Sequence, residues 1–239
     1  MTTTPTTPEM RRRFDEADKV RIHETTLARP ALRPTARSLR EHFSSEIGQA
    51  AAELENPHVE PRVTEADRAS ATPASVLLGI VLREPEPTVL VTQRHHGISF
   101  PGHWVFPGGH AEPQDTDAIA TAVREAQEEI GLSPERVEVI GRLGDYVSHS
   151  GFRVAPVVAL VHPPIELSPQ PGEVEAIAEI ELSRFLDPRS YFLFRFINRP
   201  DRAHFAMDTQ AEGLMLTGVT VSIAIGLYGE LLKTQPVPI

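Results

Sequence analysis

Residues 116–130 constrain the fold most, because they predict one helix that must carry two different faces. On a helix that turns by about 100° per residue, Glu125, Glu128 and Glu129 lie within about 100° of one another. Gly131 follows at the position where a helix commonly ends. A separate apolar stripe, which we expect to dock on a sheet, consists of Ile119, Val123 and Ile130. The chain therefore needs a sheet on one side of this helix and open space on the other.

The three glutamates of this helix need a stabilising partner. Like charges at i, i+4, here Glu125 and Glu129, destabilise a helix by about 0.2–0.5 kcal/mol. Residues 112–138 add to the repulsion, since they hold eight carboxylates against two arginines. Small side chains are expected to leave space over the acids: Ala118, Thr121 and Ala122. Mg²⁺ usually takes one or two carboxylates together with waters and substrate phosphates. With Gly108 and Gly109 allowing a close backbone approach, the pattern predicts metal-assisted phosphate chemistry.

The composition excludes several classes of protein. Acidic residues outnumber basic ones by 33 to 23, which argues against a protein whose main task is coating nucleic acid. The absence of cysteine excludes disulfide scaffolds and thiolate metal sites. No apolar run approaches the ~18 residues of a membrane span, and no apolar stretch of a secretory signal follows the N-terminal basic residues. We therefore expect a cytoplasmic protein without a membrane partner.

The chain divides into two expected parts. Residues 1–73 are predicted to form an N-terminal extension with a disordered start, an amphipathic helix at 36–54 and a polar linker at 56–73. The apolar face of that helix must be buried on the rest of the chain or across a homodimer. Residues 74–239 are predicted to form a compact α/β domain with a mixed sheet. Its expected strands are 75–81, 88–93, 138–143 and 152–161, and its other expected helices are 182–186 and 214–232.

The sequence from Gly109 to Leu132 resembles the Nudix box of the Nudix hydrolases. Its second half, REAQEEIGL from Arg124 onward, matches that box at every fixed position. In its first half, eight residues rather than seven separate Asp115 from Arg124. This one-residue insertion resembles the box of the coenzyme A diphosphatases. Further stretches similar to that subfamily extend the resemblance over about residues 74–232: 90–94 with 102–109, 150–158 and 173–182.

The resemblance implies a fold, an activity and a set of site residues. The implied fold is a Nudix-type α/β/α sandwich with a mixed sheet. The implied activity is Mg²⁺- or Mn²⁺-dependent hydrolysis of a nucleoside diphosphate linked to another group. Arg124 flanks the acids and is expected to orient them. The implied metal ligands are Glu125, Glu129, Glu128 and the carbonyl of Gly108. The general base stays open among three residues: Glu128, Glu173 and Glu175.

Other side chains near these motifs have two interpretations each. Arg94 and Arg153 are expected to contact substrate phosphates, with structural ion pairs as the alternative. Trp104 and Phe106 offer rings for stacking a base, although single aromatic side chains are more often buried anchors. A histidine metal site is disfavoured, because hard-metal phosphate chemistry does not require imidazole and the loop histidines lack helical ligand spacing: His95, His96, His103 and His110.

Two classes of function remain open at this point. The first is a Nudix pyrophosphohydrolase acting on a small nucleotide substrate. CoA or acyl-CoA is favoured, with 3′,5′-ADP and (acyl-)4′-phosphopantetheine as products, ahead of ADP-ribose, NADH or nucleoside triphosphates. The second is a non-catalytic Nudix module that senses a nucleotide. The intact carboxylate set favours the enzyme, because a sensor has no need to keep like charges along one helix face.

Overall fold

The computed structural model describes residues 18–20, 30–50, 52–196, 199–211 and 214–234. The predicted disordered start therefore falls outside the described residues. Among the helices that are described, none is long and apolar enough to cross a membrane.

One mixed sheet runs through the described part of the chain. Its strands are β1 (Asp18–Val20), β2 (Thr72–Val81), β3 (Thr88–Arg94), β4 (Trp104–Val105), β5 (Gly108–His110), β6 (Val137–Arg142), β7 (Tyr146–Val147), β8 (Phe152–Val161), β9 (Val174–Glu181), β10 (Tyr191–Phe196), β11 (Arg199–Asp208) and β12 (Met215–Thr217). They follow the order β1-β10-β11-β12-β4-β3-β2-β8-β6, while β5, β7 and β9 pair with β2, β8 and β3 off this path. β2 and β8 are parallel along their length, whereas β3 pairs antiparallel with both β2 and β9.

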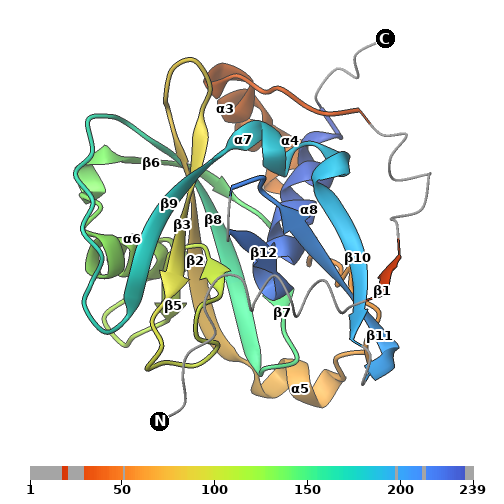
Figure 1. The fold of residues 1–239 in the computed structure, drawn as a ribbon. Coiled ribbons are helices and arrows are strands. Elements are labelled where there is room, and N and C mark those ends of the chain that lie inside the picture. The colour runs from red at the N-terminus through yellow and green to blue at the C-terminus, as the bar shows by residue number, and fades with distance from the viewer. Residues whose placement is uncertain (1–17, 21–29, 51, 197–198, 212–213, 235–239) are drawn as a thin grey trace.

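Helices cover both faces of this sheet (Figure 1). They are α3 (Ala36–Ser44), α4 (Glu46–Gln49), α5 (Glu65–Ser70), α6 (Ala118–Ile130), α7 (Leu182–Phe185) and α8 (Gly218–Leu231), with short 3-10 turns at Pro134–Arg136 and Pro188–Ser190. α6 packs on one face in its own apolar core. α3, α7 and α8 cover the other face in a second, larger core. The predicted α/β/α sandwich with a mixed sheet is confirmed.

The two central strands are apolar at nearly every position. The side chains of Leu77, Leu78, Val157 and Val158 are all fully buried, although neighbours along a strand point to opposite faces. Such continuous apolar runs are typical of strands that have helices on both faces. The strands predicted at 75–81 and 152–161 are therefore present, and β2 begins earlier, at Thr72.

The N-terminal helix α3 packs on the same core as α8. A capping box begins it, because the Thr35 hydroxyl accepts the Ser38 backbone N–H while the Thr35 N–H donates to the Ser38 hydroxyl. Leu39 and Phe43 are buried, at 0% and 3% exposure. Gly141 on β6 leaves room for Phe43, since a Cβ there would lie 2.7 Å from its ring. The apolar face of this helix is therefore buried on its own chain.

Several predicted boundaries differ from the structure. The helix predicted at 36–54 breaks at Ser45, whose backbone is extended and whose hydroxyl caps α4 instead. Ile47, expected on its apolar face, is 46% exposed. The predicted linker contains α5. The C-terminal helix begins only at Gly218, because the residues before it form β12 beside β11. Independent folding of residues 74–239 stays a prediction.

Replacing Phe43 by Ala should destabilise the full-length protein by about 3–5 kcal/mol, because it leaves a cavity between α3 and β6. The matched control is Ile47→Ala, which removes a half-exposed side chain from the neighbouring helix and should change the free energy of unfolding by about 0.5 kcal/mol or less. Urea unfolding of both variants measures the difference. Equal, small effects would show that α3 is not packed on the core in solution.

Candidate active site

The acid-bearing helix α6 is fixed at both ends by its own sequence. The Asp117 side chain caps the first turn by accepting the Ala120 backbone N–H at 2.8 Å. Gly131 ends the helix in the left-handed conformation, with φ 69°, and its N–H donates to the Gln127 carbonyl at 2.9 Å. The helix predicted at 116–130 is therefore present, and it begins two residues later.

The face of α6 that meets the sheet is built mainly from small residues. Ala122 and Ala126 are fully buried there, whereas Ile119, expected in the docking stripe, is 38% exposed. Ile130 is buried as expected. The prediction of separate apolar and acid faces was wrong, because the alanines bring the helix so close to the sheet that the acid face overlaps the docking face. Glu129 is buried as a result, at 8% exposure.

Two glycines bring β5 against this helix. Gly108 pairs with Val76 of β2, and a Cβ at Gly108 would collide with the Ser75 carbonyl oxygen. A Cβ at Gly109 would lie 2.5 Å from a carboxylate oxygen of Glu125. Neither position accepts a side chain without a shift of its neighbours. Gly108 thereby packs closely on β2, and Gly109 packs closely on the Glu125 carboxylate.

Glu129 is the buried carboxylate of the site. The Gly108 backbone N–H donates to its Oε2 at 3.1 Å. Burial raises the pKa of Glu129 to about 7, although the Gly108 hydrogen bond and the charge of Arg94 act to lower it. The charges of Glu125 and Glu173 act in the same direction as burial. Burial is also the largest cause of the raised pKa of Glu125.

Arg124 binds the other acids of the site. Its Nε and Nη2 donate to the two carboxylate oxygens of Asp115 at 3.0 and 2.9 Å. Its Nη1 donates to Glu125 at 3.1 Å and to Glu128 at 2.9 Å, and its Nη2 also donates to the His110 carbonyl at 3.0 Å. The hydrogen bonds with Arg124 hold the pKa of Asp115 well below its usual range. One guanidinium therefore connects three carboxylates and a loop carbonyl.

The turn before β9 carries Glu173 to this group. The Gln170 backbone N–H donates to the Glu129 carbonyl at 2.8 Å, which attaches the turn to the end of α6. On its other side, the His95 N–H donates to the Glu173 carbonyl at 2.9 Å. The negative charge of Glu173 contributes to the raised pKa values of both Glu125 and Glu129. The structure thus brings Glu173 together with the helix acids.

Glu175 lies beside a different set of side chains. Its Oε2 is 3.8 Å from Nε2 of His95 and 4.0 Å from Nε2 of His96. Of the two late glutamates considered as a base, Glu173 is therefore grouped with the carboxylates and Glu175 with the imidazoles.

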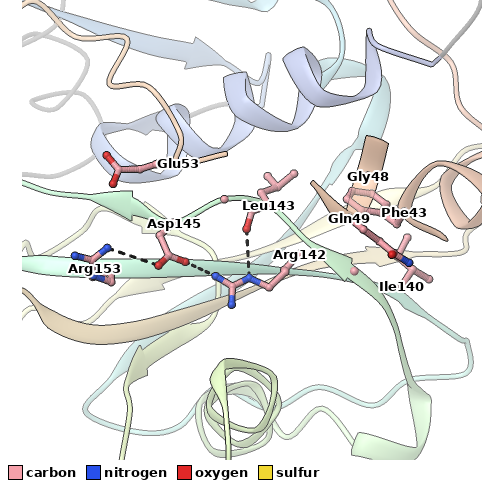
Figure 2. Close-up of a pocket in the computed structure, with 11 residues that line it drawn as sticks. Phe43, Gly48, Gln49, Glu53, Ile140, Arg142, Leu143, Asp145 and Arg153 are labelled. Atoms are coloured by element: carbon pink, nitrogen blue, oxygen red, sulfur yellow. Dashed lines mark hydrogen bonds and ion pairs between the residues drawn. The ribbon is translucent and has the colours of Figure 1, made fainter. Parts of the chain in front are cut away.

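The two arginines expected to contact phosphate lie in different places. Arg94 ends β3 and pairs with Val174, the residue after Glu173, and its charge acts against the raised pKa of Glu129. Arg153 lines a pocket of about 530 Å³ between α4 and the strands β6 and β8 (Figure 2). There its Nη2 donates to the Arg68 carbonyl at 3.0 Å and its Nη1 lies 3.9 Å from Asp145. Arg94 is therefore grouped with the candidate site. Arg153 instead contacts residues of the pocket beside β6 and is not grouped with the acids of α6.

The aromatic side chains near the site have different degrees of exposure. Phe106 is buried against Phe185, with ring centroids 6.1 Å apart, and serves the core. Trp104 packs partly buried on the larger core. Phe100, which the sequence patterns did not single out, is 58% exposed. The only sequence signal for it is the following Pro-Gly pair, which indicates a turn.

The carboxylates fit a hard divalent cation by their donor chemistry. Within the described residues, no group of three or more His, Asp or Glu side chains is placed ready to hold a metal ion, and this includes the loop histidines. Glu128 is hydrogen-bonded to Arg124 instead. Glu125 and Glu129 nevertheless supply oxygen donors whose raised pKa values reflect burial and nearby negative charge. A cation beside them would relieve both effects.

Comparison with known proteins identifies the family. The model of the NUDIX domain matches residues 74–204. The chain belongs to the Nudix family. Relatives named as uncharacterized Nudix hydrolase NudL are 37% identical over 151 residues in both Photorhabdus laumondii and Escherichia coli K12, covering 63% of this chain and 80% and 78% of those proteins. The solved Nudix hydrolase RenU of M. smegmatis has a similar fold, with a TM-score of 0.50 and 17% identity over 71% of this chain and 91% of RenU.

Membership in this family defines the general activity. The protein is a Nudix hydrolase, a pyrophosphohydrolase of nucleoside diphosphate derivatives, and enzymes of this family generally need a divalent metal such as Mg²⁺. The box residues Arg124, Glu125, Glu128 and Glu129 lie on α6, beside the glycine pair of β5.

Replacing Glu129 by Gln should stabilise the metal-free protein at pH 8. Because folding raises the Glu129 pKa from 4.5 to about 7, the stability of the wild type falls as the pH rises from 4.5 to 7. The variant lacks this penalty. Its free energy of unfolding should exceed that of the wild type by up to about 3 kcal/mol at pH 8, and the gain should vanish below pH ~4.5. Urea unfolding with a chelator tests this, and a less stable variant at pH 8 would contradict it.

Proposed function

We propose that this Nudix hydrolase cleaves the diphosphate linkage of CoA or acyl-CoA, releasing 3′,5′-ADP and (acyl-)4′-phosphopantetheine. The observation that carries the proposal is the variant spacing of the box, with one extra residue between Asp115 and Arg124. In the structure, the stretch with the extra residue runs through Asp117 into the first turns of α6. A turn just before it holds Asp115 in place: the Asp115 N–H donates to the Glu112 carbonyl, and the Glu112 N–H donates to Asp115 Oδ2, both at 2.9 Å. Asp115 still meets Arg124 through two hydrogen bonds. The insertion is thus compatible with an intact site.

The proposed ligands of Mg²⁺ or Mn²⁺ are Glu125 and Glu129, joined by Glu128 and the Gly108 carbonyl. When bound, such a cation polarises phosphoryl oxygens and neutralises the charge that develops on them. Arg124 restrains two of these side chains, Glu125 and Glu128, through its hydrogen bonds. The Gly108 N–H fixes the third, Glu129. The protein's own hydrogen bonds therefore orient the carboxylates before a cation binds.

Two further residues act on the substrate in this proposal. Arg94 contacts a phosphate, because it lies near Glu129 and its guanidinium is suited to charged hydrogen bonds. The oxygen of the attacking water forms a bond to one phosphorus of the diphosphate, and Glu173 accepts the water proton. The P–O bond to the bridging oxygen breaks, and its electron pair leaves with the departing phosphate. Its proximity to Glu125 and Glu129 supports Glu173 over Glu175. Glu128 is disfavoured as the base because its carboxylate accepts a hydrogen bond from Arg124.

A substrate panel tests the proposed specificity. CoA, dephospho-CoA, ADP-ribose and NADH are compared under identical Mg²⁺ or Mn²⁺ conditions, with products identified by chromatography. We expect CoA to be the preferred substrate. Dephospho-CoA should lose at least about tenfold in kcat/KM, because a charged hydrogen bond to the 3′-phosphate is worth about 1.5–3 kcal/mol.

Two variants connect the turnover to this site. Glu125→Gln should remove at least about 99% of kcat, since it deletes a charge in the acid cluster. Glu135→Gln removes an exposed carboxylate beyond the end of α6 and should leave turnover unchanged. Preference for ADP-ribose or NADH over CoA by more than about tenfold would overturn the subfamily assignment. Equal activity of Glu125→Gln and wild type would overturn the site itself.

The pair Glu173→Gln and Glu175→Gln tests the general base. General-base catalysis contributes about 10²- to 10⁴-fold, so Glu173→Gln should lower kcat by that factor with little change in KM. Glu175→Gln is the matched control, because it changes the same residue type two positions along the chain. It should stay within about threefold of the wild type. A larger loss in Glu175→Gln than in Glu173→Gln would reverse the assignment.

A further inference from the structure

The loop of residues 95–103 between β3 and β4 is closed by hydrogen bonds with Arg94. The Arg94 backbone N–H donates to the His103 carbonyl, and the Arg94 carbonyl accepts the Gly102 N–H, both at 2.9 Å. The Arg94 Nε then donates to the Ser99 carbonyl at 2.7 Å, inside the loop. Backbone and side chain of one arginine therefore fix the far part of the loop.

Phe100 lies in this loop with an unfavourable backbone conformation. Its φ is 56°, which is uncommon for a non-glycine residue, and the following Pro101 restricts it further. Its ring is 58% exposed and meets the ring of His103 at a centroid distance of 5.9 Å. A glycine would adopt this backbone without strain. Folding stability therefore does not explain a phenylalanine at this position, because it neither relaxes the backbone nor buries much apolar surface.

The loop begins beside the turn that carries the proposed base Glu173. Arg94, which fixes the loop, pairs across the sheet with Val174 of β9, the residue that follows the proposed base Glu173. The His95 N–H donates to the Glu173 carbonyl, which joins the first residue of the loop to the proposed base. The C-terminal end of β3 lies beside the start of β9 (Figure 1). In the described part of the chain, the other large exposed apolar side chains are aliphatic: Ile47, Val59 and Ile119.

We propose that the ring of Phe100 is a stacking surface for the nucleobase of the substrate. This proposal rests on the proposed function, since it assigns one part of a nucleoside diphosphate derivative to one side chain. Strained residues cluster at ligand-binding sites, where contact with the ligand gives the strain a use. A side chain whose backbone is held by the hydrogen bonds of its loop loses less freedom when a base stacks on it than one on an unrestrained loop. The rings of Trp104 and Phe106 are engaged in packing and leave this role to Phe100.

Direct binding to the full-length protein tests this role without reference to turnover. ADP carries a base and a diphosphate, whereas pyrophosphate carries the diphosphate alone, and both are titrated calorimetrically in Mg²⁺. For Phe100→Gly, we expect the dissociation constant of ADP to rise about tenfold and that of pyrophosphate to stay within about twofold. Its melting temperature should equal or exceed that of the wild type, because glycine relieves the backbone strain.

Two further variants separate stacking from general effects. Phe100→Trp should keep ADP affinity within about threefold of the wild type, since it retains a ring. Val59→Ala removes part of a side chain that is also about half exposed and should change neither affinity. Unchanged ADP binding in Phe100→Gly, or an equal loss for pyrophosphate, would overturn the stacking role. A wild type that binds no ADP would overturn it as well, whereas a wild type that binds ADP but hydrolyses none of the panel would contradict the proposed function alone.

Discussion

The close packing of α6 on β2 and β5 is the constraint on which the active site depends. Ala122 and Ala126 on the helix and the glycine pair of β5 allow backbones to approach where larger side chains would separate them. This approach buries Glu129 and raises its pKa to about 7. A buried carboxylate with raised pKa destabilises the metal-free fold, and such groups concentrate at functional sites. The packing that completes the core thus also creates the electrostatic condition for binding a cation.

Around that buried group, charge is distributed unequally. Arg124 compensates the outer acids, and its bonds to Asp115 and the His110 carbonyl connect the helix to the loop before it. Glu125 and Glu129 keep raised pKa values, and Glu173 adds negative charge from the turn before β9. Three segments distant in the sequence meet here: the end of β3, the helix and that turn. Their convergence accounts for an acid cluster beside the phosphate-contacting Arg94 in the proposed mechanism.

Local signals in the sequence predicted an α/β domain with a mixed sheet and the box helix, while the sandwich arrangement was implied by the resemblance to the Nudix hydrolases. Long apolar runs indicated the central strands, and Gly131 marked the end of α6. The sequence did not predict which face of α6 is buried. A helical wheel places the large apolar Ile119 on the buried face, whereas the glycines of β5 favour close contact with small residues such as alanine. The neighbours of Glu173 and Glu175 also depend on tertiary contacts. Phe100 was missed because exposure and a positive φ are properties of the folded loop.

The central claim is that the carboxylates of α6 bind the divalent cation of this Nudix hydrolase. Electron paramagnetic resonance of free Mn²⁺, titrated with the full-length protein, measures this binding directly and without substrate. We expect the wild type to bind Mn²⁺, Glu129→Gln to bind it at least about tenfold more weakly, and Glu135→Gln, whose substitution lies outside the site, to bind it like the wild type. Equal Mn²⁺ affinity of Glu129→Gln and wild type, or no binding by the wild type, would contradict it.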